Sequence, residues 1–226
     1  MLPAKSLYIH IPFCRSKCAY CDFFSIPSSS VPDLYVDSLI NEFHFHIQQC
    51  SIKRLETVYI GGGTPSLLSV KQIKRLLDEI LPHCHDFAEI TLEANPDSLS
   101  NEFLSQVSEF GINRISLGVQ SLDDKTLLLI GRRSDSAGCK KALQLLSDNG
   151  INFSADMISG LPEQTNEIFL EGLRELISFK PNHISLYSLT LEEGTPLEKR
   201  ISNGELEYSE DYGSDQWILG RDLLES

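Results

Sequence analysis

The stretch that decides the fold and the chemistry lies near the start of the chain, where residues 7–23 read LYIHIPFCRSKCAYCDF. Three of the six cysteines, Cys14, Cys18 and Cys21, stand here in the spacing C-x3-C-x2-C. The apolar run before them predicts a buried strand, and the cysteines fall in the loop that leaves it. Such a loop can fold three thiolates around one point. Three thiolates suit a [4Fe–4S] cluster that keeps one iron open, because the usual set has four cysteines.

Zinc and disulfides are the competing roles for these cysteines. A zinc site would need a fourth Cys or His, and the next candidate, His44, lies far along the chain. Disulfides are disfavoured, because three clustered cysteines do not pair evenly. Elsewhere, residues 83–85 read His-Cys-His but have no further ligand nearby. Cys50, Cys84 and Cys139 are scattered, and each is interpreted as a small apolar residue or a surface thiol.

The cysteine spacing, with Tyr20 directly before the last cysteine, resembles the radical S-adenosylmethionine (SAM) superfamily. In that family the three cysteines hold three irons, and the amino and carboxylate groups of SAM chelate the fourth. The longer string YIHIPFC, residues 8–14, resembles one branch, the oxygen-independent coproporphyrinogen oxidases and their HemW-type haem-chaperone relatives. That string is more specific than the spacing alone.

Charge and hydropathy limit the partners. The formal net charge of the 226 residues is 19 − 32 = −13, which argues against a broad nucleic-acid interface, since such interfaces are basic. No apolar run approaches the roughly 20 residues of a membrane span, and the N-terminus does not resemble a signal peptide. A reducing cytoplasm suits both free thiols and an oxygen-sensitive cluster, so we expect a cytoplasmic protein.

Six short apolar runs alternate with longer amphipathic stretches, which predicts βαβ units and a parallel sheet of the α/β class. The predicted strands are Leu7–Ile11, Thr57–Ile60, Glu89–Leu92, Arg114–Leu117, Phe153–Met157 and His183–Tyr187. The predicted helices are Asp33–Gln48, Val70–Leu81, Asn101–Phe110, Ala137–Asn149, Glu163–Phe179 and Asp215–Glu225. Six units suit an open doubly wound sheet or an incomplete barrel, and the resemblance favours a partial (β/α)6 TIM-like barrel.

In parallel-sheet folds the chemistry gathers where the strands end. Residues 61–65, Gly-Gly-Gly-Thr-Pro, follow the second run, and glycines there let the backbone approach a ligand closely. The alternative is a tight turn before a helix that is capped by Ser66 or Ser69. The resemblance implies that Gly63 and Thr64 contact SAM and that Gly62 contacts a second SAM.

Four further polar residues complete the candidate SAM site: Glu93, Gln120 and Asp156, which lie near predicted strand ends, and Arg132. A carboxylate at Glu93 can accept hydrogen bonds from ribose hydroxyls, although a surface or capping acid is the plainer interpretation. Arg132 could pair with the SAM carboxylate, or it could be a solvated arginine beside Arg133. If Asp156 is buried, it needs a partner. The family resemblance assigns all four to SAM.

The family resemblance also implies that two tyrosines and a residue of a later loop belong to the SAM site. Tyr8 corresponds to a residue near a SAM sulfonium, and Tyr20 would pack against the cluster and the adenine of SAM. Without the resemblance, both would be ordinary core or loop aromatics. Thr190 is a weaker match, because the alignment of its loop is ambiguous.

Two features favour the chaperone branch over the oxidases. The oxidases carry a further cysteine two residues after the third ligand, where this chain has Phe23. Residues 186–196, LYSLTLEEGTP, also resemble the chaperones. The resemblance then implies a cluster, SAM, haem as cargo and a haem-accepting protein, and leaves open whether the chain is catalytic.

Two alternatives remain. One is oxidative decarboxylation of coproporphyrinogen III, an oxidoreductase reaction for which a donor such as flavodoxin or ferredoxin would supply electrons. The other is a zinc-stabilised binding module.

The end of the sequence departs from the family, whose members continue into a C-terminal domain that covers the active site. We therefore expect residues 1–200 to form the radical SAM core and residues 201–226 to begin a truncated C-terminal region. An uncovered barrel mouth would expose apolar surface, so this chain alone should be poorly stable and weakly active.

Overall fold

A computed structural model describes residues 4–50 and 52–226. Six strands form one sheet in the order β1-β4-β5-β6-β7-β8. They are β1 Ser6–Ile11, β4 Leu55–Gly62, β5 Cys84–Ala94, β6 Arg114–Gln120, β7 Phe153–Ser159 and β8 His183–Ser188. The pairings of β1 with β4, β4 with β5, and β7 with β8 are all parallel. Each predicted apolar run lies inside one of these strands, so the expected α/β architecture is confirmed.

The chain forms two compact units, and β6 belongs partly to each. The first unit comprises residues 1–15, 24–94 and 98–116, and the second comprises residues 16–23, 95–97 and 117–226. The predicted cysteine loop is divided as well, because Cys14 falls in the first unit while Cys18 and Cys21 fall in the second.

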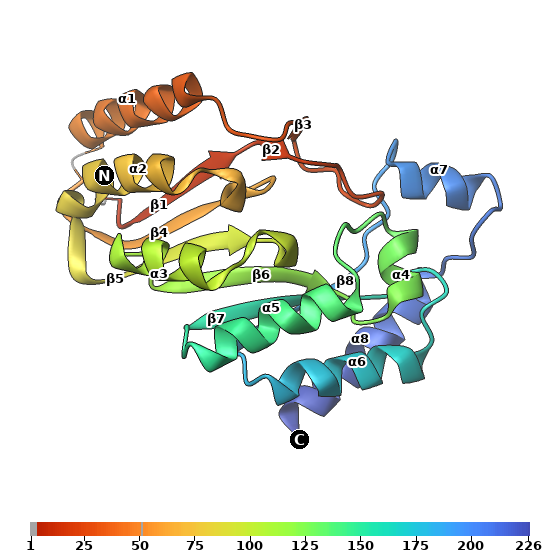
Figure 1. Cartoon of the computed structure of the whole chain (residues 1–226). Helices are drawn as coiled ribbons and strands as arrows, with labels where there is room; N and C mark the ends of the chain where they lie inside the picture. Colours follow the sequence, from red (N-terminus) through yellow and green to blue (C-terminus); the bar gives the residue numbers. More distant parts are fainter. Residues whose placement is uncertain (1–3, 51) are drawn as a thin grey trace. The chain divides into compact units, whose positions relative to one another are not determined.

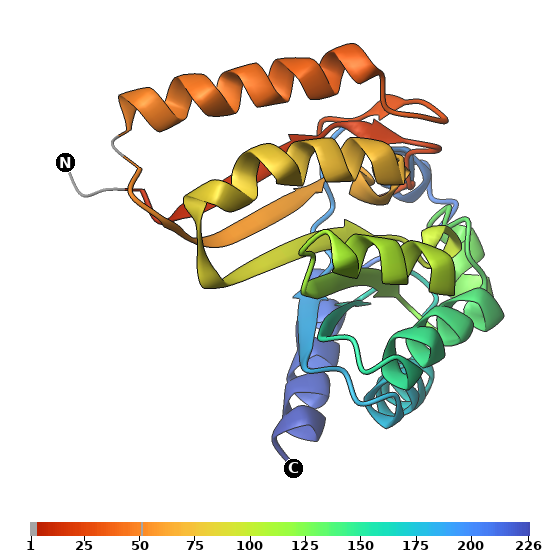
Figure 2. The same cartoon turned by 60° about the vertical axis from the view of Figure 1, so that its left-hand side comes forward.

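In the first unit, the helices are α1 Asp33–Gln49, α2 Val70–Ile80 and α3 Asn101–Glu109. The short 3₁₀ turns are η1 Pro65–Leu67, η2 Leu81–His83 and η3 Pro96–Ser98. Turn η3 belongs partly to the second unit. Figures 1 and 2 show α1 and α2 side by side. Helix α2 begins where predicted, because Ser69 and Gln72 form a capping box. Two short strands, β2 Phe13–Cys14 and β3 Ile26–Pro27, pair where the cysteine loop begins and where it returns.

In the second unit, the helices are α4 Asp124–Leu129, α5 Ser136–Asp148, α6 Asn166–Ser178, α7 Pro196–Ser202 and α8 Glu210–Glu225. The short helices α4 and α7 were not predicted. Helix α6 begins three residues later than predicted, because the Thr165 side chain caps it and Glu163 adopts a positive φ of 61°.

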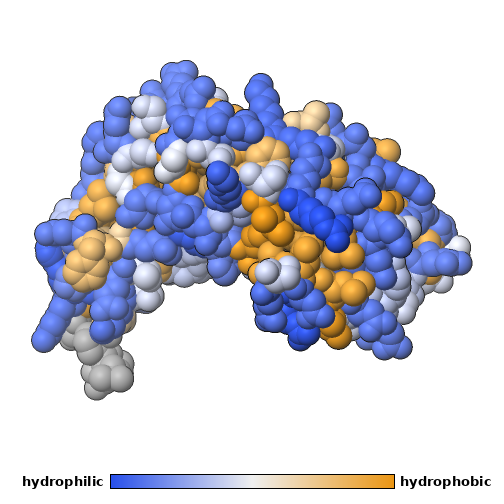
Figure 3. Space-filling model, turned by 90° about the horizontal axis from the view of Figure 1, so that it is seen from below, coloured by the Kyte–Doolittle hydropathy of each residue, from blue (hydrophilic) through white to orange (hydrophobic). Residues whose placement is uncertain are grey.

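Helix α8 packs against β7, β8 and α6 of the same unit. Gln216 accepts a hydrogen bond from the backbone of Gly160 (2.7 Å), and the Trp217 indole donates to the carbonyl of Leu186 (2.9 Å). Figure 3 views the molecule from the side of the C-terminus and shows apolar side chains at the surface. On α8, Ile218, Leu219 and Leu224 keep part of their apolar surface exposed. Within the described residues, no helix is long and apolar enough to cross a membrane.

Candidate functional site

Six of the predicted site residues lie in the first unit; Tyr8 lies within β1, and the sheet places the other five at or just beyond neighbouring strand ends. They form the set called here the Cys14 group: Tyr8, Cys14, Gly62, Gly63, Thr64 and Glu93. Strand β1 runs beside β4 with Ile11 opposite Gly62, so the cysteine loop and the glycine stretch leave the sheet together. The backbone of Gly63 donates to the carbonyl of Ile11 (2.9 Å), which fixes this arrangement.

Gly63 lies against the sulfur of Cys14. A Cβ placed on Gly63 would stand 2.8 Å from Cys14 Sγ and 2.8 Å from the carbonyl oxygen of Phe13. No side chain fits there without movement of the backbone. The hydroxyl of Thr64 donates to Cys14 Sγ at 3.4 Å. Gly63 therefore leaves room for the predicted ligand sulfur, and Thr64 donates a hydrogen bond to it.

Glu93, at the end of β5, is held by the same stretch. Its Oε2 accepts a hydrogen bond from the backbone N–H of Gly62 at 3.0 Å. Gly62 has a φ of +120°, and a Cβ there would stand 2.7 Å from His10 Nδ1, so glycine is required on both grounds. This contact fixes the position of a carboxylate that the sequence assigned to SAM.

Tyr8 pairs with His10, a residue to which the sequence gave no role. The Tyr8 hydroxyl lies 3.0 Å from His10 Nδ1, and His10 Nε2 lies 3.4 Å from the carbonyl oxygen of Phe24. A carbonyl only accepts, so Nε2 carries the proton and Nδ1 accepts from the tyrosine. Burial, followed by the negative charge of Glu93, raises the pKa of Tyr8, so the hydroxyl keeps its proton. The YIHIPFC string contained this residue, but spacing alone did not reveal its contact.

The other six predicted residues lie in the second unit together with Asn95 and make the Arg132 group: Cys18, Tyr20, Cys21, Asn95, Gln120, Arg132 and Asp156. Arg132 is at its centre. Its Nη2 donates to Asn95 Oδ1 (3.1 Å) and to the carbonyl of Gly118, and its Nη1 donates to Cys18 Sγ at 3.8 Å. The sequence did not single out Asn95, although it lies beside Glu93 in a stretch that follows a strand.

Gly118 and Gln120 adjoin this guanidinium. A Cβ on Gly118 would stand 3.1 Å from Gln120 Nε2 and 3.5 Å from Arg132 Nη2. Gln120 has a φ of 71°, which lies in the left-handed region that non-glycine residues rarely adopt. Two predicted SAM contacts, Gln120 and Arg132, therefore bring their side chains close to Gly118.

Tyr20 is fixed by apolar packing beneath the loop. Together with Ala19 it packs on the core residues Ile130, Ile158, Leu161, Leu189, Leu197 and Leu206. The backbone of Ala19 donates to Ile130 (2.9 Å) and accepts from Leu197 (2.8 Å). Burial raises the pKa of Tyr20, and the charges that act on it are those of Arg132, Cys18, Cys21 and Asp156. These residues therefore share one electrostatic environment.

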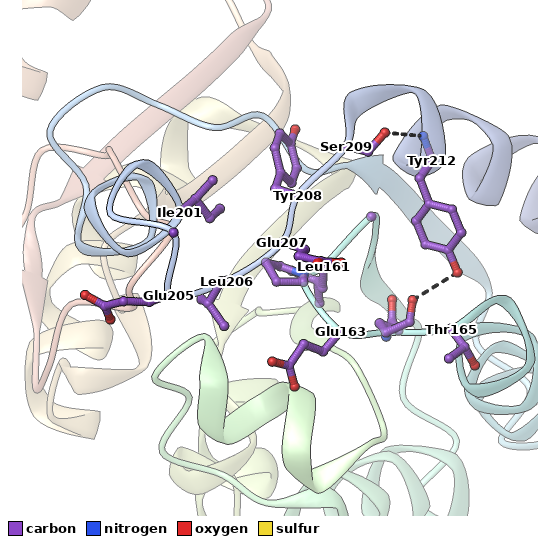
Figure 4. A pocket seen from close by; sticks show the side chains of 14 residues that line it. Leu161, Glu163, Thr165, Ile201, Glu205, Leu206, Glu207, Tyr208, Ser209 and Tyr212 are labelled. Carbon is purple, nitrogen blue, oxygen red and sulfur yellow. Dashed lines mark hydrogen bonds between the residues drawn. The ribbon is translucent and has the colours of Figure 1, made fainter.

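A cavity of about 1040 Å³ opens in the second unit between the loop after β7 and the segment that leads into α8. Figure 4 shows Tyr208 and Tyr212 beside it, with Glu163, Glu205 and Glu207. None of the predicted site residues lines it. Leu161 and Leu206 belong both to its wall and to the core beneath Tyr20. The cavity therefore adjoins the apolar core on which Tyr20 packs. It is not lined by any predicted ligand.

Thiolates are the usual ligands of a [4Fe–4S] cluster. Among the described residues, Cys14, Cys18 and Cys21 form no disulfide, and all three are partly exposed. Two of their sulfurs already receive hydrogen bonds, and Arg132 Nε is buried without an acceptor among the described residues. Within residues 4–50 and 52–226, no three His, Cys, Asp or Glu side chains stand close enough together to hold a metal ion. The three cysteines are divided between the two units, and their role as cluster ligands stays a prediction.

The His-Cys-His triplet at residues 83–85, the other metal candidate of the sequence, makes contacts with its own neighbours. Cys84 is buried and its thiol donates to the carbonyl of Ile80 at 3.5 Å. The ring of His85 stacks on Phe87, with centroids 4.9 Å apart. His44, the distant zinc candidate, contacts Glu79 at 3.0 Å.

Comparison with known proteins places the chain in a family. The model of the radical SAM superfamily matches residues 8–176. The chain belongs to the radical SAM superfamily. Its sequence is 39% identical over 225 residues to the haem chaperone HemW of Lactococcus lactis, covering 97% of this chain and 58% of the relative. It is 42% identical over 200 residues to the haem chaperone HemW of Escherichia coli, covering 86% and 53%.

The solved structure of coproporphyrinogen III oxidase from Escherichia coli, a radical SAM enzyme, is also similar. It superposes with a TM-score of 0.85 at 27% identity, covering 97% of this chain and 52% of that one. The expected partial (β/α)6 TIM-like barrel is thereby confirmed. The chain spans about half the length of the curated relatives it matches. Radical SAM membership implies a [4Fe–4S] cluster and SAM.

Proposed function

We propose that this chain is a HemW-like radical SAM protein that binds haem and delivers it to a haem-requiring acceptor. The observation that carries the proposal is its 39% and 42% identity to two haem chaperones, against 27% to the coproporphyrinogen oxidase. Phe23, which stands where the oxidases have a further cysteine, supports the same branch.

In this proposal Cys14, Cys18 and Cys21 would hold a [4Fe–4S] cluster. The cluster and the SAM bound to it would supply one-electron chemistry. The Arg132 group offers a cationic donor to the SAM carboxylate, because Arg132 Nε has no acceptor among the described residues. The Cys14 group offers the Glu93 carboxylate to hydroxyl or amino groups of SAM. Tyr8 and Tyr20 would line the site, and Gln120 and Asp156 complete it.

A second candidate function is oxidative decarboxylation of coproporphyrinogen III, which the TM-score of 0.85 to the oxidase favours. An electron donor such as flavodoxin or ferredoxin would serve that reaction. A zinc-stabilised binding module remains the alternative from another class.

Anaerobic reconstitution with iron and sulfide tests the proposal. We expect about four irons per chain, from the cluster stoichiometry, and their loss in a Cys14/Cys18/Cys21→Ala triple variant. The matched control is Cys50→Ala, since Cys50 is an exposed cysteine outside the loop. Zinc in the purified protein, with no cluster after reconstitution, would support the zinc module instead.

Two further assays separate the chaperone from the oxidase. Titration of the reconstituted chain with haem should give a saturable change in the haem absorption band. Incubation with coproporphyrinogen III, SAM and a reductant should leave the substrate unchanged. Turnover would replace the chaperone by the oxidase, and absence of saturable haem binding would contradict haem delivery by this chain.

A further inference from the structure

The guanidinium of Arg132 is held in one orientation. Its Nη2 donates to Asn95 Oδ1 at 3.1 Å and to the carbonyl of Gly118. One acceptor directly follows β5 and the other lies within β6, so the planar group cannot turn without losing a partner. Its other terminal nitrogen, Nη1, then faces Cys18 Sγ at 3.8 Å.

This geometry differs from that of the neighbouring arginine. Arg133 is about half exposed and forms an ion pair with Asp97 (3.1 Å). Arg132 Nε is buried, and Nη1 of the same guanidinium donates a hydrogen bond to the sulfur of Cys18, a predicted cluster ligand. Two adjacent residues of equal charge therefore have different surroundings, one at a cysteine sulfur and one at the surface.

Hydrogen bonds to the sulfurs of an iron–sulfur cluster set its reduction potential, together with burial and charge. Reduction adds one negative charge, and a donor at a ligand sulfur stabilises the more negative state. A cationic donor is stronger than a neutral one. A guanidinium at Cys18 Sγ should therefore make the cluster easier to reduce.

We propose that Arg132 raises the reduction potential of the cluster through its hydrogen bond to the Cys18 sulfur, and that Asn95 is the positioning residue for this guanidinium. The inference rests on the proposed function, because it requires the cluster at Cys14, Cys18 and Cys21. It assigns Arg132 a role toward the cluster in addition to its predicted contact with SAM.

The experiment is an anaerobic redox titration of the reconstituted full chain without SAM, followed by the electron paramagnetic resonance signal of the reduced cluster. Arg132→Met removes the donor and should shift the midpoint potential to a more negative value. Asn95→Ala removes one anchor of the guanidinium and should give a smaller shift in the same direction. Arg133→Met removes an equal charge from the next residue and should leave the potential unchanged. Iron content is measured for each variant.

An Arg132→Met variant that holds four irons at the wild-type potential would overturn the inference. So would an Arg133→Met shift as large as that of Arg132→Met, since a general field would then explain both. If Arg132→Met does not fold or does not hold the cluster, Asn95→Ala decides, and an unchanged potential there overturns the inference. A wild-type chain without a cluster would instead refute the proposed function.

Discussion

The Cys14 group and the Arg132 group surround their cysteine sulfurs with different kinds of contact. In the Cys14 group, the missing side chain of Gly63 leaves room for the Cys14 sulfur, which accepts a hydrogen bond from the neutral hydroxyl of Thr64. In the Arg132 group the loop rests on a buried apolar core and the sulfur receives a charged donor. The difference suggests that backbone shape governs the first group, whereas side-chain packing and charge govern the second.

The two groups also differ in the charge that they offer to a ligand. The Cys14 group presents a carboxylate, Glu93, fixed by a backbone N–H. The Arg132 group presents a guanidinium fixed by an amide oxygen and a carbonyl. The carboxylate is an acceptor suited to hydroxyl or amino groups, whereas the guanidinium is a donor suited to carboxylates.

The largest effect on stability should come from the packing beneath the Arg132 group. Leu197 is fully buried in the core that supports Tyr20. Leu197→Ala should lower the free energy of unfolding by about 2–5 kcal/mol, because it leaves a cavity. The measurement is urea unfolding of the chain, with iron content after reconstitution as a second readout.

Leu128→Ala is the matched control in the same unit, because Leu128 is 80% exposed on α4. Its effect should stay within about 0.5 kcal/mol. Equal destabilisation by the two substitutions would contradict the view that buried packing supports the loop.

A backbone substitution should have the next largest effect, and it tests the Cys14 group. Gly63→Ala places a Cβ 2.8 Å from Cys14 Sγ and 2.8 Å from the Phe13 carbonyl oxygen. We expect a loss of about 1–3 kcal/mol in unfolding free energy, as for overpacked sites, and a lower iron content. Thermal unfolding and iron analysis measure both.

Gly172→Ala on α6 serves as the control, since a Cβ there meets nothing nearer than 3.7 Å. That variant should be as stable as the wild type or more so, because alanine favours the helix. If Gly63→Ala retains both wild-type stability and full iron content, the glycine is not needed at the sulfur.

The sequence predicted the strands and most helices well, because apolar periodicity is local and each strand is a short buried run. It missed α4 and α7, which are six and seven residues long and too short to display a helical period. It also extended α6 to Glu163, because the period alone did not reveal the capping role of Thr165.

The candidate site was predicted unevenly. The glycine stretch, Glu93 and Gln120 stand at predicted strand ends, whereas Arg132 and Asp156 were selected through the family resemblance. The structure assigns these residues to two sets, one in each unit. His10 and Asn95 were given no role, although they hold Tyr8 and Arg132. Their function is to orient another side chain, and such a contact depends on three-dimensional proximity that sequence spacing does not record.

The smallest effect should be that of the neutral donor, and it compares the two groups directly. Thr64→Val keeps the shape of the side chain but removes the hydroxyl that donates to Cys14 Sγ. In the redox titration this variant should shift the midpoint potential in the negative direction by less than Arg132→Met, because a neutral donor is weaker than a cationic one. Thr57→Val, on β4 of the same unit, should leave the potential unchanged. A Thr64→Val shift equal to or larger than that of Arg132→Met would show that charge does not distinguish the two sulfurs, and the contrast between the groups would then lie in their packing alone.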